Sequence, residues 1–287
     1  MGQQFDLRGD QLLKRDLVFD FGLHKGEDTA FYLEKGFRVV SFEANPELAQ
    51  ACRSRFSAQI ETGTLTIMEG AVAPASAGDT LTFFVNERSV WGTIDKDWVE
   101  RNEKAGAASK KITARRIDVE EVIREFGMPF YMKIDIEGAD QYVLEVLASF
   151  PDRPKYISIE SSKEDLGEVI AECDRLRTLG YSRFKAVQQE YIPGRQGVFA
   201  RRNGEQFSYT FPADSSGPFG DDVRQSWVSY EGILDDYRTI FRKYRLFGSG
   251  SPLMRVPGLH KFLWHAGKLG NTGFPGWYDT HAALDDE

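Results

Sequence analysis

The chain has 287 residues, of which 41% are hydrophobic, and its formal net charge at pH 7 is −8. This length can build one sizeable core in one or two domains, and the negative charge argues against a general nucleic-acid-binding protein. No apolar run approaches the ~20 residues of a membrane helix, and no secretion signal or disulfide framework is evident. We therefore expect a cytoplasmic protein without a transmembrane segment.

Short apolar runs alternate with helical segments as far as residue 190. Strands are predicted at 17–21, 37–43, 63–72, 130–138, 155–161 and 182–189, with a further edge strand at 79–86. Two of the intervening helices have clear N-cap residues, Asn45 and Asp118. The alternation predicts an α/β fold with a doubly wound, mostly parallel sheet, in which ligands bind at the carboxyl ends of the strands.

The pattern changes after residue 190. A stretch rich in glycine, serine and proline precedes a predicted helix around residues 233–247, and the last residues, 271–287, are aromatic and turn-rich. We therefore divide the chain into a core at 1–190 and a C-terminal elaboration at 190–287 that packs on the core. The elaboration is expected to form a lid on the acceptor side or a surface for a partner.

A run of basic residues lies within this elaboration. From position 238 to position 270 the chain has no Asp or Glu but seven basic residues: Arg238, Arg242, Lys243, Arg245, Arg255, Lys261 and Lys268. One interpretation is a solvated helix face. The other is a surface for an acidic substrate, a partner or a membrane.

The turn after the first strand discriminates between cofactors. Dinucleotide-binding turns place a second glycine where the backbone approaches the pyrophosphate, but this chain has His24 there. S-adenosylmethionine has no pyrophosphate. It requires an acid near its ammonium, a close-packed glycine near its methionine part and an acid for its ribose hydroxyls. Asp20 and Gly22 can supply the first two. Glu43 stands at about the ~20-residue spacing of a ribose acid, although it can also merely cap the next helix.

Several segments together resemble one family. They are VFDFGLHKGEDTAFYLEKGFRVVSFEANPE, EGAVAP, RIDVEEVI, YMKIDIEGAD and YISIES, in this order. Over roughly residues 16–190 the chain is similar to FkbM-type methyltransferases, a Rossmann-like class that depends on S-adenosylmethionine. The resemblance implies O-methylation of a hydroxyl group on a small molecule, sugar or natural product. The chain departs from the family's asparagine- and glycine-rich first loop at Leu23, His24 and Lys25.

The resemblance also implies roles for individual residues. It places Asp20 and Gly22 at the methionine part, Glu43 at the ribose, Gly70 and Ala71 at the adenine, and Asp135 and Glu137 beside the transferring methyl group. A hydroxyl acceptor benefits from a base as it loses its proton, so His24, Asp135 and Glu137 are the catalytic candidates. His24 can instead only pack on the cofactor. Ser89 and Trp91, in the loop after the edge strand, are candidates for the acceptor pocket, although Trp91 can instead simply fill the core. Lys133 is expected to pair with an acid.

Other functions and cofactors stay open. Asp135, Glu137, Asp140 and Glu160 make an acid-rich edge that suits a hard divalent cation, but no ligand spacing fixes one, so no metal ligand is assigned. The acceptor is expected to be a small molecule, and an anionic one if the basic run borders its entrance. The alternatives are a non-catalytic methyltransferase-like protein that binds a partner through its basic tail and, more weakly, a nicotinamide-dependent oxidoreductase.

Overall fold

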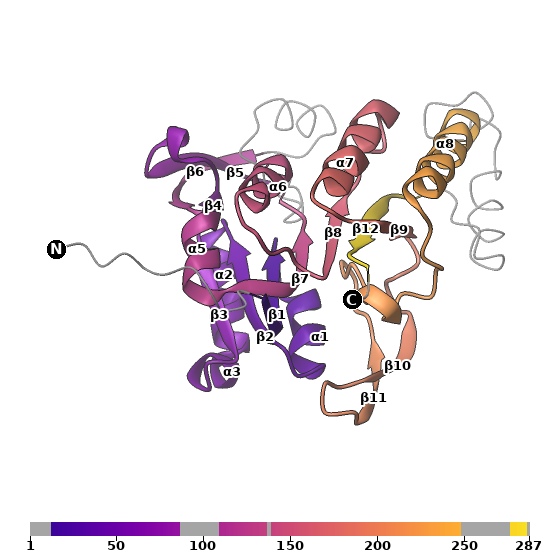
Figure 1. The fold of residues 1–287 in the computed structure, drawn as a ribbon. Helices are drawn as coiled ribbons and strands as arrows, with labels where there is room; N and C mark the ends of the chain where they lie inside the picture. Colours follow the sequence, from indigo (N-terminus) through magenta and orange to yellow (C-terminus); the bar gives the residue numbers. More distant parts are fainter. Residues whose placement is uncertain (1–12, 87–108, 137–138, 248–275, 286–287) are drawn as a thin grey trace, which may run out of the picture.

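The structure is a computed structural model that describes residues 13–86, 109–136, 139–247 and 276–285 (Figure 1). Its largest feature is a seven-stranded sheet with the order β3-β2-β1-β7-β8-β12-β9. The strands are β1 (Leu13–Phe21), β2 (Arg38–Glu43), β3 (Leu65–Glu69), β7 (Met128–Ile134), β8 (Tyr156–Glu160), β9 (Arg183–Gln188) and β12 (Tyr278–Ala283). From β3 to β8 neighbouring strands pair in parallel, whereas β12 is antiparallel to both its neighbours. The predicted doubly wound, mostly parallel α/β sheet is confirmed.

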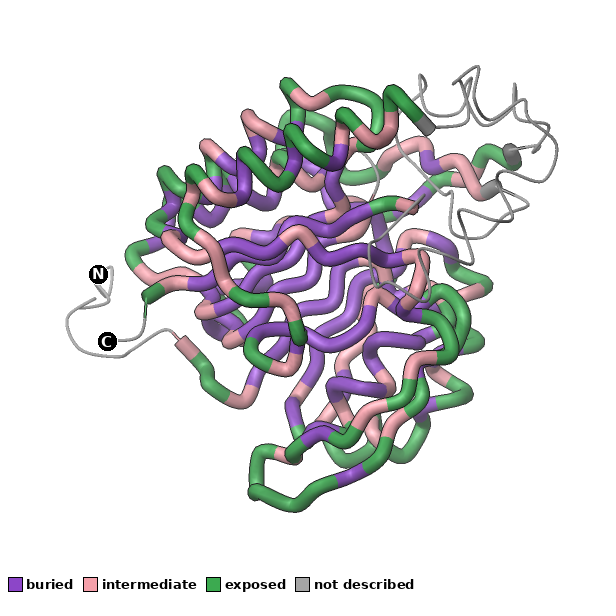
Figure 2. Tube along the Cα trace, turned by 90° about the vertical axis from the view of Figure 1, so that its right-hand side faces the viewer, coloured by how far each residue is buried: buried purple, intermediate pink, exposed green. Residues whose placement is uncertain are grey.

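Helices cover both faces of this sheet. One face is packed by α5 (Val119–Phe126), α6 (Asp140–Ala148), α7 (Leu166–Thr178) and α8 (Tyr230–Phe247), and the other by α1 (Glu27–Glu34) and α2 (Pro46–Arg55), which α3 (Ser57–Glu61) follows. In β1, Leu17 and Phe19 belong to the first core and Val18 to the second, because successive side chains of a strand alternate between faces. Figure 2 shows the buried strands between these layers. Within the described ranges, every helix is too short or too polar to cross a membrane.

The two predicted N-caps fix where their helices begin. The side chain of Asn45 accepts a hydrogen bond from the backbone N–H of Glu47 at 3.0 Å, at the start of α2. Asp118 accepts from the N–H of Glu120 at 3.0 Å, at the start of α5. Each cap satisfies a backbone donor that the first turn of a helix leaves without a partner.

A small second sheet differs from the arrangement that the sequence predicts. The strand expected at 63–72 divides at Gly70 into β3 and β4 (Ala71–Val72). β4 joins β6 (Ser109–Ile117) and β5 (Thr80–Asn86) in a separate three-stranded sheet with the order β4-β6-β5. The residues predicted as an edge strand are therefore a strand outside the main sheet. A short 3-10 helix, η1 (Ala75–Ala77), connects β4 to β5.

The segment after residue 190 packs against α1. It contains the hairpin β10 (Gln196–Ala200) and β11 (Gln206–Thr210), then the 3-10 helix η3 (Gly220–Asp222). The ring of Phe31 on α1 lies 5.0 Å from the rings of Phe199 and Phe211, centroid to centroid. Aromatic contacts at this spacing attach the hairpin to α1, the helix that precedes β2 in the chain.

The expectation that the chain ends in turns is wrong for residues 278–283, which form β12 inside the main sheet. All six residues of β12 are buried, yet three of them, Asp279, Thr280 and His281, are polar. Thr280 lies within hydrogen-bond distance of Ser161 and Tyr237, at 2.5 and 2.6 Å. Such a strand lacks the apolar run that identifies a buried strand in a sequence, because its polar groups find partners only after folding.

Candidate functional site

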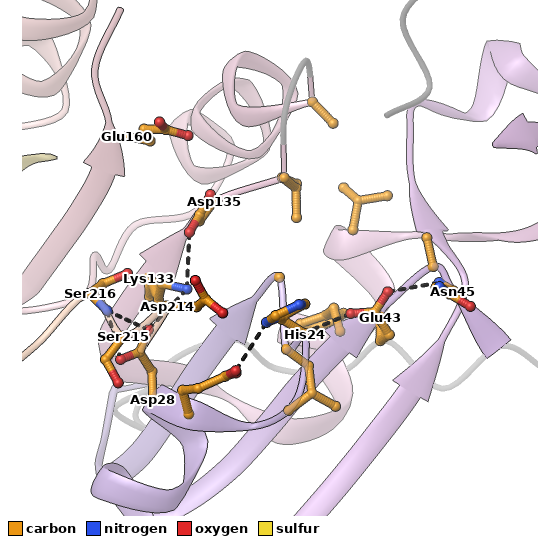
Figure 3. A pocket seen from close by; sticks show the side chains of 18 of the residues that line it. His24, Asp28, Glu43, Asn45, Lys133, Asp135, Glu160, Asp214, Ser215 and Ser216 are labelled. Carbon is orange, nitrogen blue, oxygen red and sulfur yellow. Dashed lines mark hydrogen bonds and ion pairs between the residues drawn. The ribbon is translucent and has the colours of Figure 1, made fainter. Parts of the chain in front are cut away.

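A cavity of about 460 Å³ lies at the carboxyl ends of the parallel strands. Loops after β1, β2, β3, β7 and β8 contribute to its wall, together with the first residues of β12. β12 reaches this edge with its N-terminal end because it runs against its neighbours. The volume is that of an ordinary small-molecule site. Figure 3 shows that the polar side chains of the cavity gather around His24, Glu43, Lys133 and Asp135.

Gly22 brings the ends of β1 and β7 together. Its φ is +93°, and a Cβ atom at this position would lie 2.1 Å from the backbone oxygen of Asp135. The N–H groups of Gly22 and Leu23 donate to the carbonyl oxygen of Phe42 at 3.2 and 2.9 Å, which fixes the turn on β2 as well. Only glycine combines this φ with so close an approach.

His24 occupies the wall of the cavity, where a dinucleotide-binding turn would have a glycine. Its φ is +50°, its N–H donates to Glu43 Oε2 at 2.8 Å, and its ring Nδ1 lies 3.1 Å from Glu27 Oε1. Burial alone would raise the pKa of Glu27, but the hydrogen bond and the charge of His24 outweigh it, so that pKa is lowered. The ring therefore has a fixed place beside a carboxylate.

Glu43, at the end of β2, is buried and lines the cavity. One carboxylate oxygen accepts the N–H of His24, and the other accepts the N–H of Asn45 at 2.7 Å. Burial raises the pKa of Glu43, although these two N–H groups act against that rise. The contact with Asn45 is the capping role that the sequence left open. Each oxygen can still accept a second hydrogen bond, so the ribose contact stays a prediction.

Lys133 is a buried cation in the cavity wall. Its Nζ lies 3.2 Å from Asp135 Oδ2, 3.2 Å from Asp28 Oδ2 and 3.8 Å from Asp20 Oδ1, so the expected pairing with an acid is confirmed. Burial would lower the pKa of Lys133, but the three carboxylates more than offset this and hold the pKa well above its ordinary value. The cation is therefore permanently charged and neutralises part of the acid cluster.

Asp20 lies behind Lys133 and does not belong to the cavity wall. It is 1% exposed and accepts a hydrogen bond from the Thr29 hydroxyl at 2.5 Å. Burial raises the pKa of Asp20 to about 7, against the opposing charge of Lys133. Because Lys133 lies between Asp20 and the cavity, a direct contact between Asp20 and a cofactor ammonium stays a prediction.

Gly70 and Ala71 form the opposite, apolar wall. A Cβ atom on Gly70 would lie 2.5 Å from the backbone oxygen of Arg115, and the N–H of Gly70 donates to the carbonyl of Glu43 at 2.8 Å. Phe83 and Val85 of β5 line the same part of the cavity. The small sheet thus supplies a flat apolar surface next to Glu43.

Asp135 directly follows β7 and lines the cavity next to the turn at Gly22, and its side chain is 38% exposed. Glu160 at the end of β8 and Asp279 at the start of β12 continue the wall. Asp279 belongs to a loop-like segment, 275–281, that the sequence suggests as part of a lid; the structure instead places Asp279 in strand β12. For Glu160 the sequence predicts only a place in an acid-rich edge.

The segment after residue 190 closes another side of the cavity. The N–H of Ser216 donates to both oxygens of Asp28 at 3.0 and 3.1 Å, and Asp214 Oδ2 lies 3.8 Å from Lys25 Nζ. Asp28 is a site residue that the sequence analysis does not predict, whereas the segment at 214–216 belongs to the elaboration that is expected to border the acceptor side. His24, Glu27 and Asp214 have ligand atoms within 4.8 Å of one another, and this is the group of possible metal ligands that the described residues form.

Some candidates cannot be placed. Glu137, Ser89 and Trp91 lie outside the described residues, as do Arg255, Lys261 and Lys268 of the basic run. The other four basic residues, Arg238, Arg242, Lys243 and Arg245, are on α8, and none of them lines the cavity. The expectation of a positive acceptor entrance stays a prediction.

The parallel sheet with a cavity at its strand ends is a Rossmann-like arrangement. The model of the FkbM methyltransferase domain matches residues 20–182, more than half of the sequence. The chain belongs to this family, which implies S-adenosylmethionine as the cofactor.

Solved structures with a related arrangement have low sequence identity to the chain. Precorrin-6Y C5,15-methyltransferase from Geobacter metallireducens has 12% identity and a TM-score of 0.34, covering 71% of this chain and 78% of its own. Precorrin 8w decarboxylase from Methanobacterium thermoautotrophicum has 16% identity and a TM-score of 0.34, with coverages of 69% and 78%. A human methyltransferase 10 domain containing protein has 8% identity and a TM-score of 0.35, with coverages of 74% and 76%. No curated protein matches the sequence significantly.

Proposed function

We propose that this methyltransferase transfers the methyl group of S-adenosylmethionine to a hydroxyl oxygen of a small molecule, such as a sugar or a natural product. The observation that carries the proposal is the contact of Gly22 with the backbone of Asp135, in the same cavity as Glu43. Because Gly22 has no Cβ, the turn after β1 packs directly against the end of β7, next to the carboxylate at the end of the neighbouring strand β2.

Along the edge of the sheet, neighbouring groups of cavity residues suit successive parts of the cofactor. The apolar wall at Gly70 and Ala71 suits the flat adenine, and Glu43 can accept hydrogen bonds from ribose hydroxyls. Gly22 would lie against the methionine part. Asp135, on the next strand, would then border the sulfonium, whose positive charge a carboxylate stabilises.

The protein's part in the reaction is alignment, exclusion of water and removal of a proton. Methyl transfer is an in-line displacement, so holding the acceptor oxygen on the axis of the breaking bond supplies much of the rate. A carboxylate near that oxygen accepts its proton as the bond forms. Asp135 is the described carboxylate that best fits this role, because it lines the cavity and Lys133 holds it at 3.2 Å. His24 and Glu137 are the further candidates.

The test combines a binding measurement with a product analysis. Calorimetry should show S-adenosylhomocysteine binding, whereas NADH should not bind. Incubation with S-adenosylmethionine carrying a ¹³C-labelled methyl group and a panel of hydroxyl compounds should give a methoxy signal by NMR. An N-methyl signal would contradict O-methylation. NADH binding without S-adenosylhomocysteine binding would instead favour the oxidoreductase, and cofactor binding without transfer to any acceptor would favour the non-catalytic alternative.

A further inference from the structure

The cavity continues beyond the part that the proposed cofactor would fill. In the sheet order, the strand ends assigned to the cofactor are those of β3, β2, β1 and β7, and the next two strands are β8 and β12. Glu160 ends β8 and Asp279 begins β12, and these two residues are direct partners across the antiparallel pair. This part of the wall therefore faces the acceptor. The inference rests on the proposed function, because that function decides which strand ends face the cofactor and which face the acceptor.

Within the described ranges of the chain, neither carboxylate forms an ion pair with a side chain of opposite charge. Asp279 is 5% exposed and lines the cavity, and no hydrogen bond or ion pair joins its side-chain carboxylate to another described residue. The same holds for Glu160 among the described residues. Buried carboxylates are normally paired or hydrogen-bonded, because an unpaired charge in a low-dielectric site is costly. Two neighbouring exceptions at the wall of a cavity indicate that a ligand supplies the partner.

The nearby described cations form no ion pair with these carboxylates, although the charges of Lys163 and Lys133 act against the rise in the pKa of Glu160. Lys133 is already held by Asp135, Asp28 and Asp20. Lys163 lies over the ring of Trp277, with its Nζ 5.5 Å from the ring centroid. Burial and the charge of Asp135 raise the pKa of Glu160 to about 7, and burial, Asp135 and Glu160 raise the pKa of Asp279 well above its ordinary value. An added positive charge would relieve this repulsion.

The spacing of the carboxylates favours an organic cation over a directly bound metal ion. Among the described residues, the group whose ligand atoms converge within 4.8 Å is His24, Glu27 and Asp214, and not Asp135, Glu160 and Asp279. A metal ion needs its ligand atoms to converge on one point. A protonated amine has three donors that point in different directions, so it can bind oxygens that lie farther apart.

We propose that the acceptor carries a protonated amine, which binds between Glu160 and Asp279 and holds the reacting hydroxyl beside Asp135. The ammonium is the anchor and not the methylated atom, because a protonated nitrogen has no lone pair to attack the methyl group. Among the described residues, seven carboxylates line the cavity against two lysines, Lys133 and Lys163: Glu27, Asp28, Glu43, Asp135, Glu160, Asp214 and Asp279. This wall would repel the anionic acceptor that the basic run suggested.

The proposal is tested with matched pairs of small probes. The first compound of each pair carries amine where the second carries hydroxyl. The pairs are glucosamine and glucose, putrescine and 1,4-butanediol, and ethanolamine and ethylene glycol. Calorimetry on the wild-type protein, with and without S-adenosylhomocysteine, should show at least one amine binding ~10-fold or more tighter than its hydroxyl partner. The heat should depend on the buffer, since binding of a cation to partly protonated carboxylates releases protons.

Variants assign the effect to this wall. Asp279→Asn and Glu160→Gln should each remove the preference for the amine while leaving the affinity for S-adenosylhomocysteine unchanged. Glu168→Gln, which removes an exposed carboxylate of α7 outside the cavity, should retain the preference. Circular dichroism and thermal melting of each variant establish that it is folded.

Three results would overturn the proposal. They are equal binding of amines and their hydroxyl partners, an amine preference that survives both substitutions, and no amine binding at all. Stabilisation by Mg²⁺ that disappears in Asp279→Asn and Glu160→Gln would reassign the pair to a metal ion. Failure of the wild-type protein to bind S-adenosylhomocysteine would overturn the proposed function instead, and amine binding to the cofactor-free protein would still report on Glu160 and Asp279.

Discussion

Gly22 and Asp135 meet so closely that the protein has no room for one carbon atom between them. A Cβ on Gly22 would lie 2.1 Å from the Asp135 backbone oxygen. Because this contact joins the ends of β1 and β7, it fixes the part of the cavity where the cofactor and the acceptor would meet.

Gly22→Ala should therefore lower both stability and cofactor affinity. Strain at a positive φ alone costs about 1–3 kcal/mol, and the clash adds to it. Gly204→Ala is the matched control, because Gly204 has a φ of +90° and open space around its Cβ position. We expect urea denaturation to show a larger loss for Gly22→Ala and calorimetry to show weaker S-adenosylhomocysteine binding in that variant alone. Equal losses in the two variants would remove the contact with Asp135 from the explanation.

Glu43 should contribute to cofactor binding through its carboxylate. Glu43→Gln retains the size of the side chain but loses the charge, so we expect S-adenosylhomocysteine to bind with about 1.5–3 kcal/mol less free energy, the range for hydrogen bonds to a charged group. Glu69→Gln is the control, since Glu69 is the partner of Glu43 on β3, binds Arg53 and does not line the cavity. Unchanged affinity in a folded Glu43→Gln variant would leave Glu43 only its capping role.

Lys133 should be essential for stability because it neutralises buried acids. Lys133→Met removes the cation and leaves Asp20, Asp28 and Asp135 to repel one another, which we expect to cost about 3–5 kcal/mol in the free energy of unfolding. The loss should be smaller at pH 5.5 than at pH 8, since protonation of the carboxylates relieves the repulsion. Lys25→Met, which removes an exposed lysine 3.8 Å from Asp214, should cost less than about 1 kcal/mol. A small loss that is independent of pH in Lys133→Met would contradict the idea.

Asp279 should destabilise the unliganded protein as the pH rises. Burial raises its pKa in the folded state, so the folded state binds a proton more tightly than the unfolded state does. Stability from this group is therefore complete below the ordinary pKa of about 3.9 and is lost as the pH rises from there through the folded-state pKa. Asp279→Asn removes this loss, so its melting temperature should exceed that of the wild type by an amount that grows between pH 5 and pH 8. Asp235→Asn, at an exposed site on α8, should show no such trend.

Asp135 should act on the acceptor more than on the cofactor. Asp135→Asn keeps the backbone oxygen that meets Gly22 but loses the base, so we expect turnover to fall about 10²–10⁴-fold with little change in S-adenosylhomocysteine affinity. The pH profile of turnover should also lose the limb that reports the base. His24→Asn tests the rival candidate, since asparagine tolerates the positive φ. If His24→Asn loses that limb and Asp135→Asn keeps it, the base is His24.

The sequence by itself determined the features that depend on neighbours along the chain. Asn45 and Asp118 cap their helices because an N-cap needs only a side-chain oxygen two or three residues before the N–H that it accepts. The apolar runs of β1, β2, β7 and β8 identify strands buried on both faces, and their alternation with helices fixes a parallel sheet with its loops at one edge. For the same reason the turn at Gly22 and the carboxylate of Glu43 could be assigned to that edge.

Only the tertiary structure decided what pairs distant segments. β12 enters the sheet between β8 and β9 although its residues are half polar, because Thr280 obtains partners from Ser161 and Tyr237 once the layers pack. The same insertion places Asp279 beside Glu160, and the fold of the segment after residue 190 places Ser216 on Asp28. Hydropathy and spacing indicate whether a residue is suited to burial. The partner that makes a buried polar group stable comes from elsewhere in the chain, and only the folded arrangement specifies that partner.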